Sequence, residues 1–194
     1  MPKKRKHRTA FQRANDMLEA EGRKQCTLLY GATGIVLNRM WGKGQKAIIN
    51  FFDVTGEVWR DCASTNLHSM VELCEQETGI EIQNGEGKSW RDLPYMNATL
   101  DTGRMTYAQW IYMRQQQTKW IPAQIMACML ISLHRKYGYG YRKCAEIYRR
   151  IQETEAEYGY DPEKIRTACM EIIGIDIVDT FTKPRDTREG KEVV

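Results

Sequence analysis

The sequence predicts an all-α protein built from two tandem, internally duplicated four-helix units that pack together. Apolar residues recur at intervals of three and four through most of the chain, which is the spacing of one face of a helix. Residues 133–143 repeat residues 37–46 at a register of 96, with Leu, Arg, an aromatic residue, two Gly and a final cation at matching positions. A chain of 194 residues, 42% of them hydrophobic, is long enough to give two small units a buried core.

The first predicted unit covers residues 9–82. Its apolar spacing predicts four helices, over residues 9–24, 25–41, 45–58 and 67–78. Gly22 is expected to end the first helix and the Gly42-Lys43-Gly44 turn the second, because glycine readily takes the left-handed conformation that ends a helix. Gly79 is expected to end the fourth helix in the same way.

The second predicted unit covers residues 104–178 and shows the pattern more clearly. Its apolar residues are spaced for helices over residues 107–113, 122–133, 141–151 and 161–173. Pro122 is expected to open the second of these helices, because proline is favoured at a first helical position. Asp161 marks the start of the fourth helix and Gly174 its end. Gly174 follows Gly79 by 95 positions, so one residue has been lost within the second unit.

The remaining segments are polar. Residues 83–103, rich in Gly, Asn, Asp and Ser, are predicted to form a linker that Trp90 and Tyr95 hold against a helical face. Residues 1–8 form a basic tail and residues 179–194 a charged one, and both are expected to be disordered. Three interpretations of the basic tail stay open: a solvated tail, a phosphate-binding arm or a nuclear import signal.

The reactive side chains give little support for catalysis. The six cysteines form no Cys-x-x-Cys pair and several lie among apolar residues, so we interpret them as reduced thiols used in packing. The three histidines have no metal-ligand spacing, and neither Gly31-Ala32-Thr33-Gly34 nor Gly42-Lys43-Gly44 matches a phosphate-binding loop. We therefore expect no enzyme, no cofactor and no metal site. No apolar run reaches the ~18 to 20 residues of a membrane span, and no signal peptide is predicted, so we expect no membrane partner.

A cluster of cations is the strongest functional signal. It surrounds the Gly138-Tyr139-Gly140 turn, where tyrosines alternate with cations, and a weaker echo surrounds the turn at residues 42–44. Such cations bind phosphates, and such tyrosines stack on bases or bind the backbone. The expected contact residues are Arg135, Lys136, Tyr139, Arg142, Lys143, Arg149 and Arg150, with Arg39, Lys43 and Lys46 as the echo. A solvated face or a protein-binding face is the alternative. Tyr137 is expected in the core, because it takes the place of Trp41.

Residues 133–143, the helix after them and the ending Gly174-Ile175-Asp176-Ile177 resemble small helical proteins of unknown function from Gram-positive phages and integrated mobile elements. In that family, a leucine, a polar pair and a lysine precede Phe-Gly-Phe-Gly, basic residues, a helix and a final Gly-Ile-Asp/Glu. The likeness covers residues 133–177 well and the first unit loosely. This sequence departs from the family at Tyr137 and Tyr139, where Phe is usual. The resemblance implies a phage or mobile-element accessory protein and transfers no site residues.

We therefore predict a non-enzymatic accessory protein in the cytoplasm of a bacterial host, with DNA or RNA bound at the basic face of the second unit. The net charge of +4 permits such a partner without requiring it. The alternative is an anti-CRISPR-like inhibitor or regulator that binds a host protein, such as a defence nuclease. Because each unit is small for an independent core, we expect either that the two units pack together or that the chain forms a homodimer.

Overall fold

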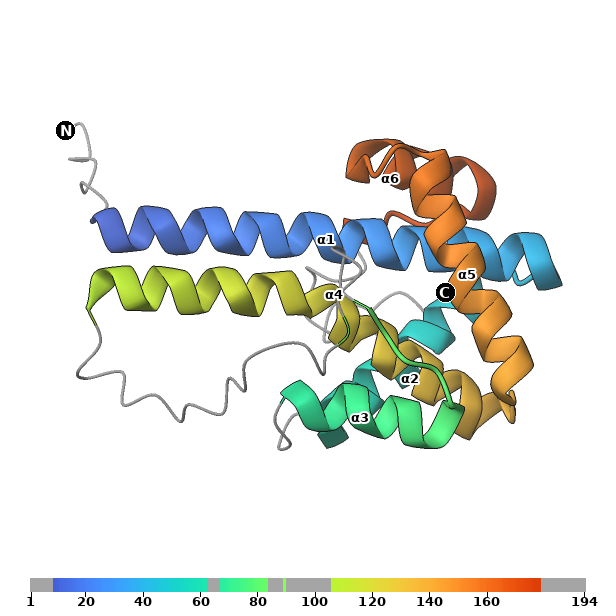
Figure 1. The fold of residues 1–194 in the computed structure, drawn as a ribbon. Coiled ribbons are helices and arrows are strands. Elements are labelled where there is room, and N and C mark those ends of the chain that lie inside the picture. Colours follow the sequence, from blue (N-terminus) through green and yellow to red (C-terminus); the bar gives the residue numbers. More distant parts are fainter. Residues whose placement is uncertain (1–8, 63–66, 84–88, 90–105, 179–194) are drawn as a thin grey trace, which may run out of the picture.

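The structure is a computed structural model that describes residues 9–62, 67–83, 89 and 106–178. These residues are mostly helical and contain no strand, so the predicted all-α class is confirmed for them. The helices are α1 (Ala10–Trp41), α2 (Gln45–Cys62), α3 (Leu67–Thr78), α4 (Tyr107–Tyr137), α5 (Tyr141–Glu157) and α6 (Pro162–Ile173) (Figure 1). The predicted tails and most of the predicted linker, with Trp90 and Tyr95, lie outside the described residues.

The first two predicted helices of each half are one continuous helix. α1 runs through Gly22, and α4 runs through Pro122. A Cβ atom on Gly22 would lie 3.5 Å from Cδ1 of Ile121, so α4 packs directly on this part of α1. Such packing outweighs the low helix propensity of one glycine, about 1 kcal/mol, and the proline interrupts a helix of 31 residues without ending it. The predicted end at Gly22, the predicted start at Pro122 and the division into four-helix units are therefore wrong.

Local capping groups define the ends of the two long helices. The Thr9 side chain accepts a hydrogen bond from the backbone N–H of Gln12, whose own side chain accepts one from the backbone N–H of Thr9. Thr106 caps α4 in the same way. Gly42 and Gly138 end the helices with φ of 59° and 65°, in the left-handed region that favours glycine. The expected end of the helix at the first glycine turn is thus confirmed.

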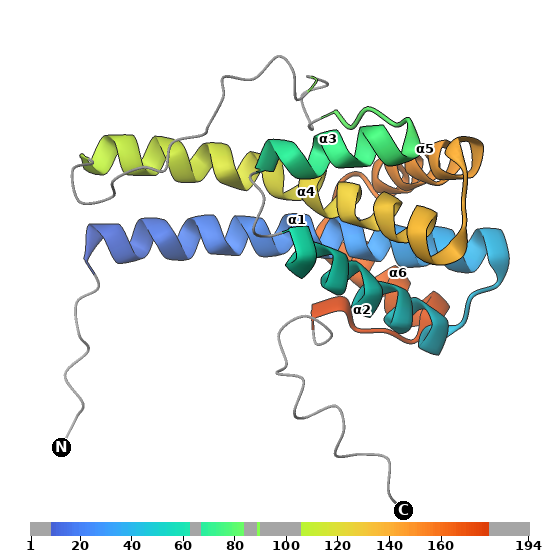
Figure 2. The ribbon, with the colours of Figure 1, turned by 90° about the horizontal axis from the view of Figure 1, so that it is seen from below.

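α1 and α4 lie side by side and run in the same direction (Figures 1 and 2). Their first parts project together from the rest of the molecule; we call residues 10–26 and 107–122, which precede the long buried stretches of the two helices, the stalk. α1 packs against α5 and α6, whereas α4 packs against α2 and α3. Each long helix is therefore flanked by the short helices of the other half.

A single hydrophobic core includes residues of both halves. Near its centre, Thr33 Oγ1 on α1 lies 3.3 Å from Met129 Sδ on α4. α6 approaches α1 most closely at Gly31, where a Cβ atom would lie only 2.1 Å from Cγ2 of Ile165. Because all of these contacts join one half to the other, the described helices form one packed body rather than two separate cores.

Three large apolar or aromatic side chains of the predicted helices point outward. Met17 is 73% exposed, because the stalk leaves this side of α1 uncovered. On α6, Ile172 is exposed and Ile173 is buried, since the buried row starts at Ile165 and continues every four residues. Tyr137 is 37% exposed at the end of α4 instead of lying in the core. Helical spacing therefore identified the helices better than it identified the buried side of each one.

Candidate nucleic-acid interface

The two glycine turns lie at the same end of the molecule, opposite the tip of the stalk (Figures 1 and 2). They meet there because α1 and α4 run in the same direction and end at Gly42 and Gly138. Trp41, just before the first turn, contacts Tyr139 in the second, with ring centroids 5.6 Å apart. The cations predicted from the two halves therefore surround one surface, which we call the turn end: residues 39–46 and 135–143.

Aromatic side chains form a continuous row at the turn end. The ring centroids of Phe51 and Tyr137 lie 6.1 Å apart, and those of Tyr137 and Tyr139 lie 6.0 Å apart. The contact between Tyr139 and Trp41 continues the row onto α1. Lys143 Nζ lies 4.9 Å from the centroid of the Tyr139 ring, within the range of a cation–π interaction. This aromatic row joins the two turns, and the Lys143 ammonium group lies against the row.

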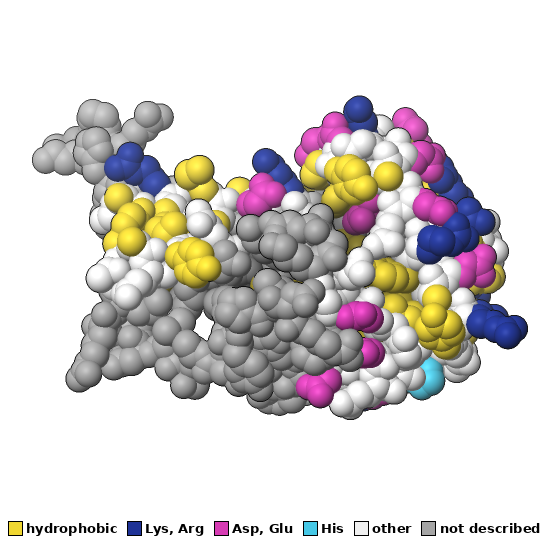
Figure 3. Space-filling view, viewed as in Figure 1, with side chains coloured by type: hydrophobic (Ala, Val, Ile, Leu, Met, Phe, Trp, Pro, Cys, Tyr) yellow, Lys and Arg dark blue, Asp and Glu magenta, His cyan; other side chains and the backbone are white. Residues whose placement is uncertain are grey.

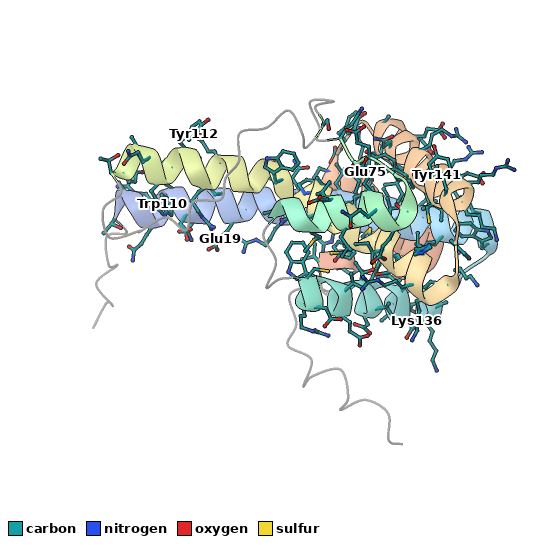
Figure 4. All side chains as sticks on the ribbon, turned by 60° about the horizontal axis from the view of Figure 1, so that its bottom comes forward. Glu19, Glu75, Trp110, Tyr112, Lys136 and Tyr141 are labelled. Atoms are coloured by element: carbon teal, nitrogen blue, oxygen red, sulfur yellow. The ribbon has the colours of Figure 1, made fainter. Side chains whose placement is uncertain are left out.

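Five of the predicted contact residues form no ion pair with a carboxylate among the described residues. They are Lys43, Lys46, Lys136, Arg142 and Lys143. All five side chains are exposed, and Figure 3 shows Lys and Arg side chains at this end of the molecule. Figure 4 shows Lys136 extending away from the ribbon. Their positive charge is available to an anionic partner.

Two predicted arginines instead connect the two halves. Arg39 donates to both carboxylate oxygens of Glu157, at 2.7 and 3.1 Å, and to the Tyr158 hydroxyl at 3.2 Å. Arg135 donates to both carboxylate oxygens of Glu77, at 2.9 and 2.5 Å. The hydrogen bonds that the arginines donate to these carboxylates raise the pKa of each guanidinium, and the bond from Arg39 lowers the pKa of Glu157. Both arginines are already occupied in a planar, bidentate geometry.

The other two predicted arginines lie on a surface of mixed charge. Arg149 and Arg150 both form ion pairs with Glu153. Arg150 also lines a hollow of about 380 Å³ between α1 and α5, whose charged lining consists of two arginines and three glutamates. Since acidic groups outnumber basic ones there, this face is a poor site for phosphate. Among the predicted contact residues, those without an ion pair in the described ranges all lie at the turn end.

α5 begins without a side-chain cap. Its N-cap is Gly140, and its first turn contains Arg142 and Lys143 but no acidic residue. α6, in contrast, begins with Asp161, whose carboxylate accepts from two backbone N–H groups, as the sequence predicts. Cations near a helix N-terminus oppose the helix dipole by about 0.3 to 1 kcal/mol each. The first turn of α5 therefore carries charges that disfavour the helix and favour a bound anion.

Two tyrosines of the turn end are missing from the predicted set of contact residues. Tyr141, the first residue of α5, is 60% exposed. Tyr137, the last residue of α4, is also exposed and lies just before the same turn. Both belong to the alternation of tyrosines with cations in the sequence, and this pattern could have identified them as contact residues. It did not reveal their exposure, because that depends on which short helix packs behind each ring.

Glu155 is the acidic residue whose environment the sequence did not reveal. Glu146, Glu153 and Glu157 on the same helix are exposed, but Glu155 is half-buried, and burial raises its pKa to about 7. Burial raises the pKa of nearby Tyr148, and the charge of Glu155 contributes to the same shift. The Tyr148 hydroxyl accepts a hydrogen bond from the backbone N–H of Gln83 at 3.3 Å. Glu155 therefore titrates near neutral pH.

The remaining reactive groups are poorly placed for chemistry. The six thiols are free, and burial raises the pKa of Cys74 and of Cys169 to about 12, so both stay protonated at neutral pH. Within the described ranges, no group of three or more His, Cys, Asp and Glu side chains is arranged to bind a metal ion. None of the helices in those ranges has the length and apolar character needed to cross a membrane.

No protein-family model matches this chain, and neither the curated proteins nor the solved structures contain a match. Function is therefore inferred from the turn end itself.

Proposed function

We propose that this protein is a non-enzymatic nucleic-acid-binding accessory protein that contacts phosphates through the turn end. The observation that supports this most is a group of five exposed cations, contributed by both halves of the chain, around the aromatic row. In the part of the chain that the structure describes, none of the five forms an ion pair with a carboxylate. Most protein contacts to nucleic acid are made to the phosphate backbone by cations and backbone N–H groups. The basic first turn of α5 and the net charge of +4 favour the same partner.

We also infer that the two halves are internal duplicates related by an approximate two-fold axis between α1 and α4. The packing supports this, because α1 contacts the second and third helices of the second half, and α4 contacts those of the first half. Arg39 and Arg135, at equivalent positions, each bind a glutamate of the other half. The chain is thus comparable to two intertwined protomers joined by a linker.

The resemblance to small phage proteins adds a proposal about origin. Residues 133–177, which show this resemblance, form the end of α4, the second turn, α5 and α6. This part contributes three of the four aromatic residues and four of the seven cations of the turn end. We propose an accessory protein of a bacteriophage or mobile element that acts in the cytoplasm of its bacterial host.

Fluorescence anisotropy with labelled DNA and RNA at 50 and 200 mM salt tests phosphate binding. Contact with about five phosphates predicts an affinity loss of roughly 100- to 500-fold over this range of salt. The double variant Arg142→Glu/Lys143→Glu should bind at least ~10-fold more weakly at 50 mM salt. Its affinity should also depend less steeply on salt, with a slope smaller by about 1.5 to 2.

A charge-matched control lies on the stalk. Arg23→Glu/Lys24→Glu changes the net charge by the same amount at exposed positions of α1, roughly 27 Å along the helix from Gly42. Charges this far away are largely screened at about 0.1 M salt, so affinity should change by no more than about 2-fold. Equal losses in the two double variants, or an unchanged affinity of the turn-end variant, would contradict the proposal.

A second candidate function, a protein-binding regulator of a host factor, is favoured by the stalk. Met17 is 73% and Tyr112 62% exposed there, and Figures 3 and 4 show apolar side chains along this projecting element. Exposed apolar patches of this kind often mark protein interaction sites. A stoichiometric host protein captured by the wild type and by the Arg142→Glu/Lys143→Glu variant, but lost with Met17→Glu/Tyr112→Glu, would support it. Recovery of no such protein by the wild type would argue against it.

A further inference from the structure

We infer that the nucleic acid bound at the turn end is single-stranded, and that Tyr137 and Tyr141 stack on its unpaired bases. This inference rests on the proposed function and names the class of ligand at the same surface. It depends on how each ring is supported, how much of it is exposed, and which charges lie beside it.

Tyr141 has one supported side and one free side. A Cβ atom added to Gly79 would lie 3.1 Å from Cδ2 and 3.8 Å from Cε2 of the Tyr141 ring, so the backbone at the end of α3 backs that ring. Gly79 has φ of 73° and carries no side chain that would displace the ring. The side chain is nevertheless 60% exposed. A supported ring loses little conformational freedom when a base stacks on it.

Tyr137 is supported in a different way. Its ring leans on Phe51 at 6.1 Å and on Tyr139 at 6.0 Å, with interplanar angles of 50° and 46°. The residue is 37% exposed at the end of α4. Tyr139 itself is half-buried and contacts both Trp41 and the Lys143 ammonium group, so we assign it a supporting role in the row.

Each exposed tyrosine has next to it in the chain a cation that forms no ion pair with any described carboxylate. Lys136 precedes Tyr137, and Arg142 follows Tyr141. Figure 4 shows Lys136 and Tyr141 at the same end of the molecule, away from Trp110 and Tyr112 on the stalk. This is the combination used by proteins that bind single strands, in which aromatic rings stack on bases while cations follow the backbone.

The two tyrosine rings could not stack on the bases of a duplex. In double-stranded DNA the faces of the bases are covered by their neighbours, and only base edges are accessible in the grooves. Reading those edges requires side chains such as Arg, Asn or Gln at the start of the inserted helix. α5 begins with a tyrosine, and the two cations that follow it, Arg142 and Lys143, are the residues proposed to contact phosphates. The aromatic surface therefore fits unpaired bases better than paired ones.

The test compares a labelled single strand of about 15 nucleotides, as DNA and as RNA, with its duplex, using the full chain and fluorescence anisotropy at 50 mM salt. The single strand should bind at least ~10-fold more tightly than the duplex. Tyr141→Ala should weaken single-strand binding by ~5- to ~150-fold, the range found when stacking rings are replaced by alanine. Tyr141→Phe keeps the ring and should stay within about 2-fold of the wild type.

Tyr112→Ala is the matched control, because Tyr112 is exposed to the same degree, 62%, but lies on the stalk. Tyr137→Ala and Tyr137→Phe are compared in the same way, with thermal unfolding to verify the fold because this ring contacts Phe51. Duplex binding as tight as single-strand binding, or an unchanged affinity of Tyr141→Ala, overturns the inference. If Arg142→Glu/Lys143→Glu still weakens binding in that case, the proposed function stands. No binding of either form by the wild type rejects both.

Discussion

Thr33 Oγ1 on α1 lies 3.3 Å from Sδ of Met129 on α4, a residue 96 positions later in the chain. This separation equals the register at which residues 37–46 recur as residues 133–142. In a two-fold arrangement, equivalent residues contact each other only beside the axis. The proposed duplication places α1 and α4 beside a two-fold axis. It therefore predicts a contact between equivalent residues of these two helices, such as Thr33 and Met129.

The exchange of short helices predicts that the two halves stay together when the chain is cut. A specific protease site inserted within residues 90–105 should give, after cleavage, a 1:1 complex of two fragments. The reason is that α2 and α3 bury their apolar faces on α4, and α5 and α6 bury theirs on α1. Size-exclusion chromatography with light scattering, before and after cleavage, measures this. Two peaks, each with about half of the original mass, would contradict the interlocked packing.

The close approach of α6 to α1 predicts a large effect of a single methyl group at Gly31. In Gly31→Ala the new Cβ atom would clash with Ile165, and overpacking of this kind lowers stability by about 1 to 3 kcal/mol. The melting temperature should then fall by roughly 3 to 10 °C, as followed by circular dichroism. Gly56→Ala is the control, since no atom lies within 4 Å of a Cβ there and alanine favours a helix by about 0.5 to 1 kcal/mol. A similar change in both variants would contradict the proposed contact.

Glu155 predicts a loss of stability as pH rises toward neutrality. Its pKa is about 7 in the folded protein against an ordinary value of 4.5, so the folded state holds the proton more tightly than the unfolded state does. The contribution of this group is greatest below pH ~4.5 and is lost as pH rises through ~7. Glu155→Gln should therefore stabilise the protein by about 1 to 2 kcal/mol at pH 8 and have little effect at pH 4.5.

Urea unfolding of both proteins at the two pH values measures the effect of Glu155→Gln. Glu146→Gln, which changes an exposed carboxylate on the same helix, is the control. Equal stability of Glu155→Gln and the wild type at pH 8 would show that Glu155 is better hydrated than its position on α5 indicates.

Arg135 and Arg142 should differ in what they contribute. Arg135→Gln removes a partly exposed pair with Glu77 and should lower stability by about 0.5 to 1 kcal/mol, with little effect on nucleic-acid affinity. Arg142 has no carboxylate partner in the described part of the chain. Arg142→Gln should therefore lower nucleic-acid affinity with little effect on stability. A double-mutant cycle with Glu77→Gln isolates the coupling in the first case. A loss of affinity in Arg135→Gln as large as in Arg142→Gln would place Arg135 among the phosphate contacts.

Features of the fold that depend on neighbouring residues were predictable from the sequence. Asp161 at the start of α6 and Gly174 at its end act locally, and both predictions are confirmed. Gly22 was misinterpreted because the continuity of α1 is supported by Ile121, 99 positions later in the chain, which no local pattern contains. The register of 96 relates equivalent residues, but it does not say whether a long helix packs with the short helices of its own half or of the other.

The same distinction applies to the candidate site. The sequence identified the cations around both turns but not which of them are free, because Arg39 is paired with a glutamate 118 positions away. It also could not bring the two turns to one surface without the parallel arrangement of α1 and α4. Tyr141 was missed because its exposure and its support by Gly79 depend on the position of α3.

The two turns are not identical, and this difference gives the turn end a direction. The first turn has Trp41 and Lys43 where the second has Tyr137 and Tyr139. If the protein consisted of two separate copies of one half, both turns would carry the same side chains. In a single chain, the side chains of the two turns can differ. A nucleic-acid strand also has a chemical polarity along its backbone. A strand crossing from one turn to the other would therefore meet unlike groups in a fixed order, and the surface would favour one of its two orientations.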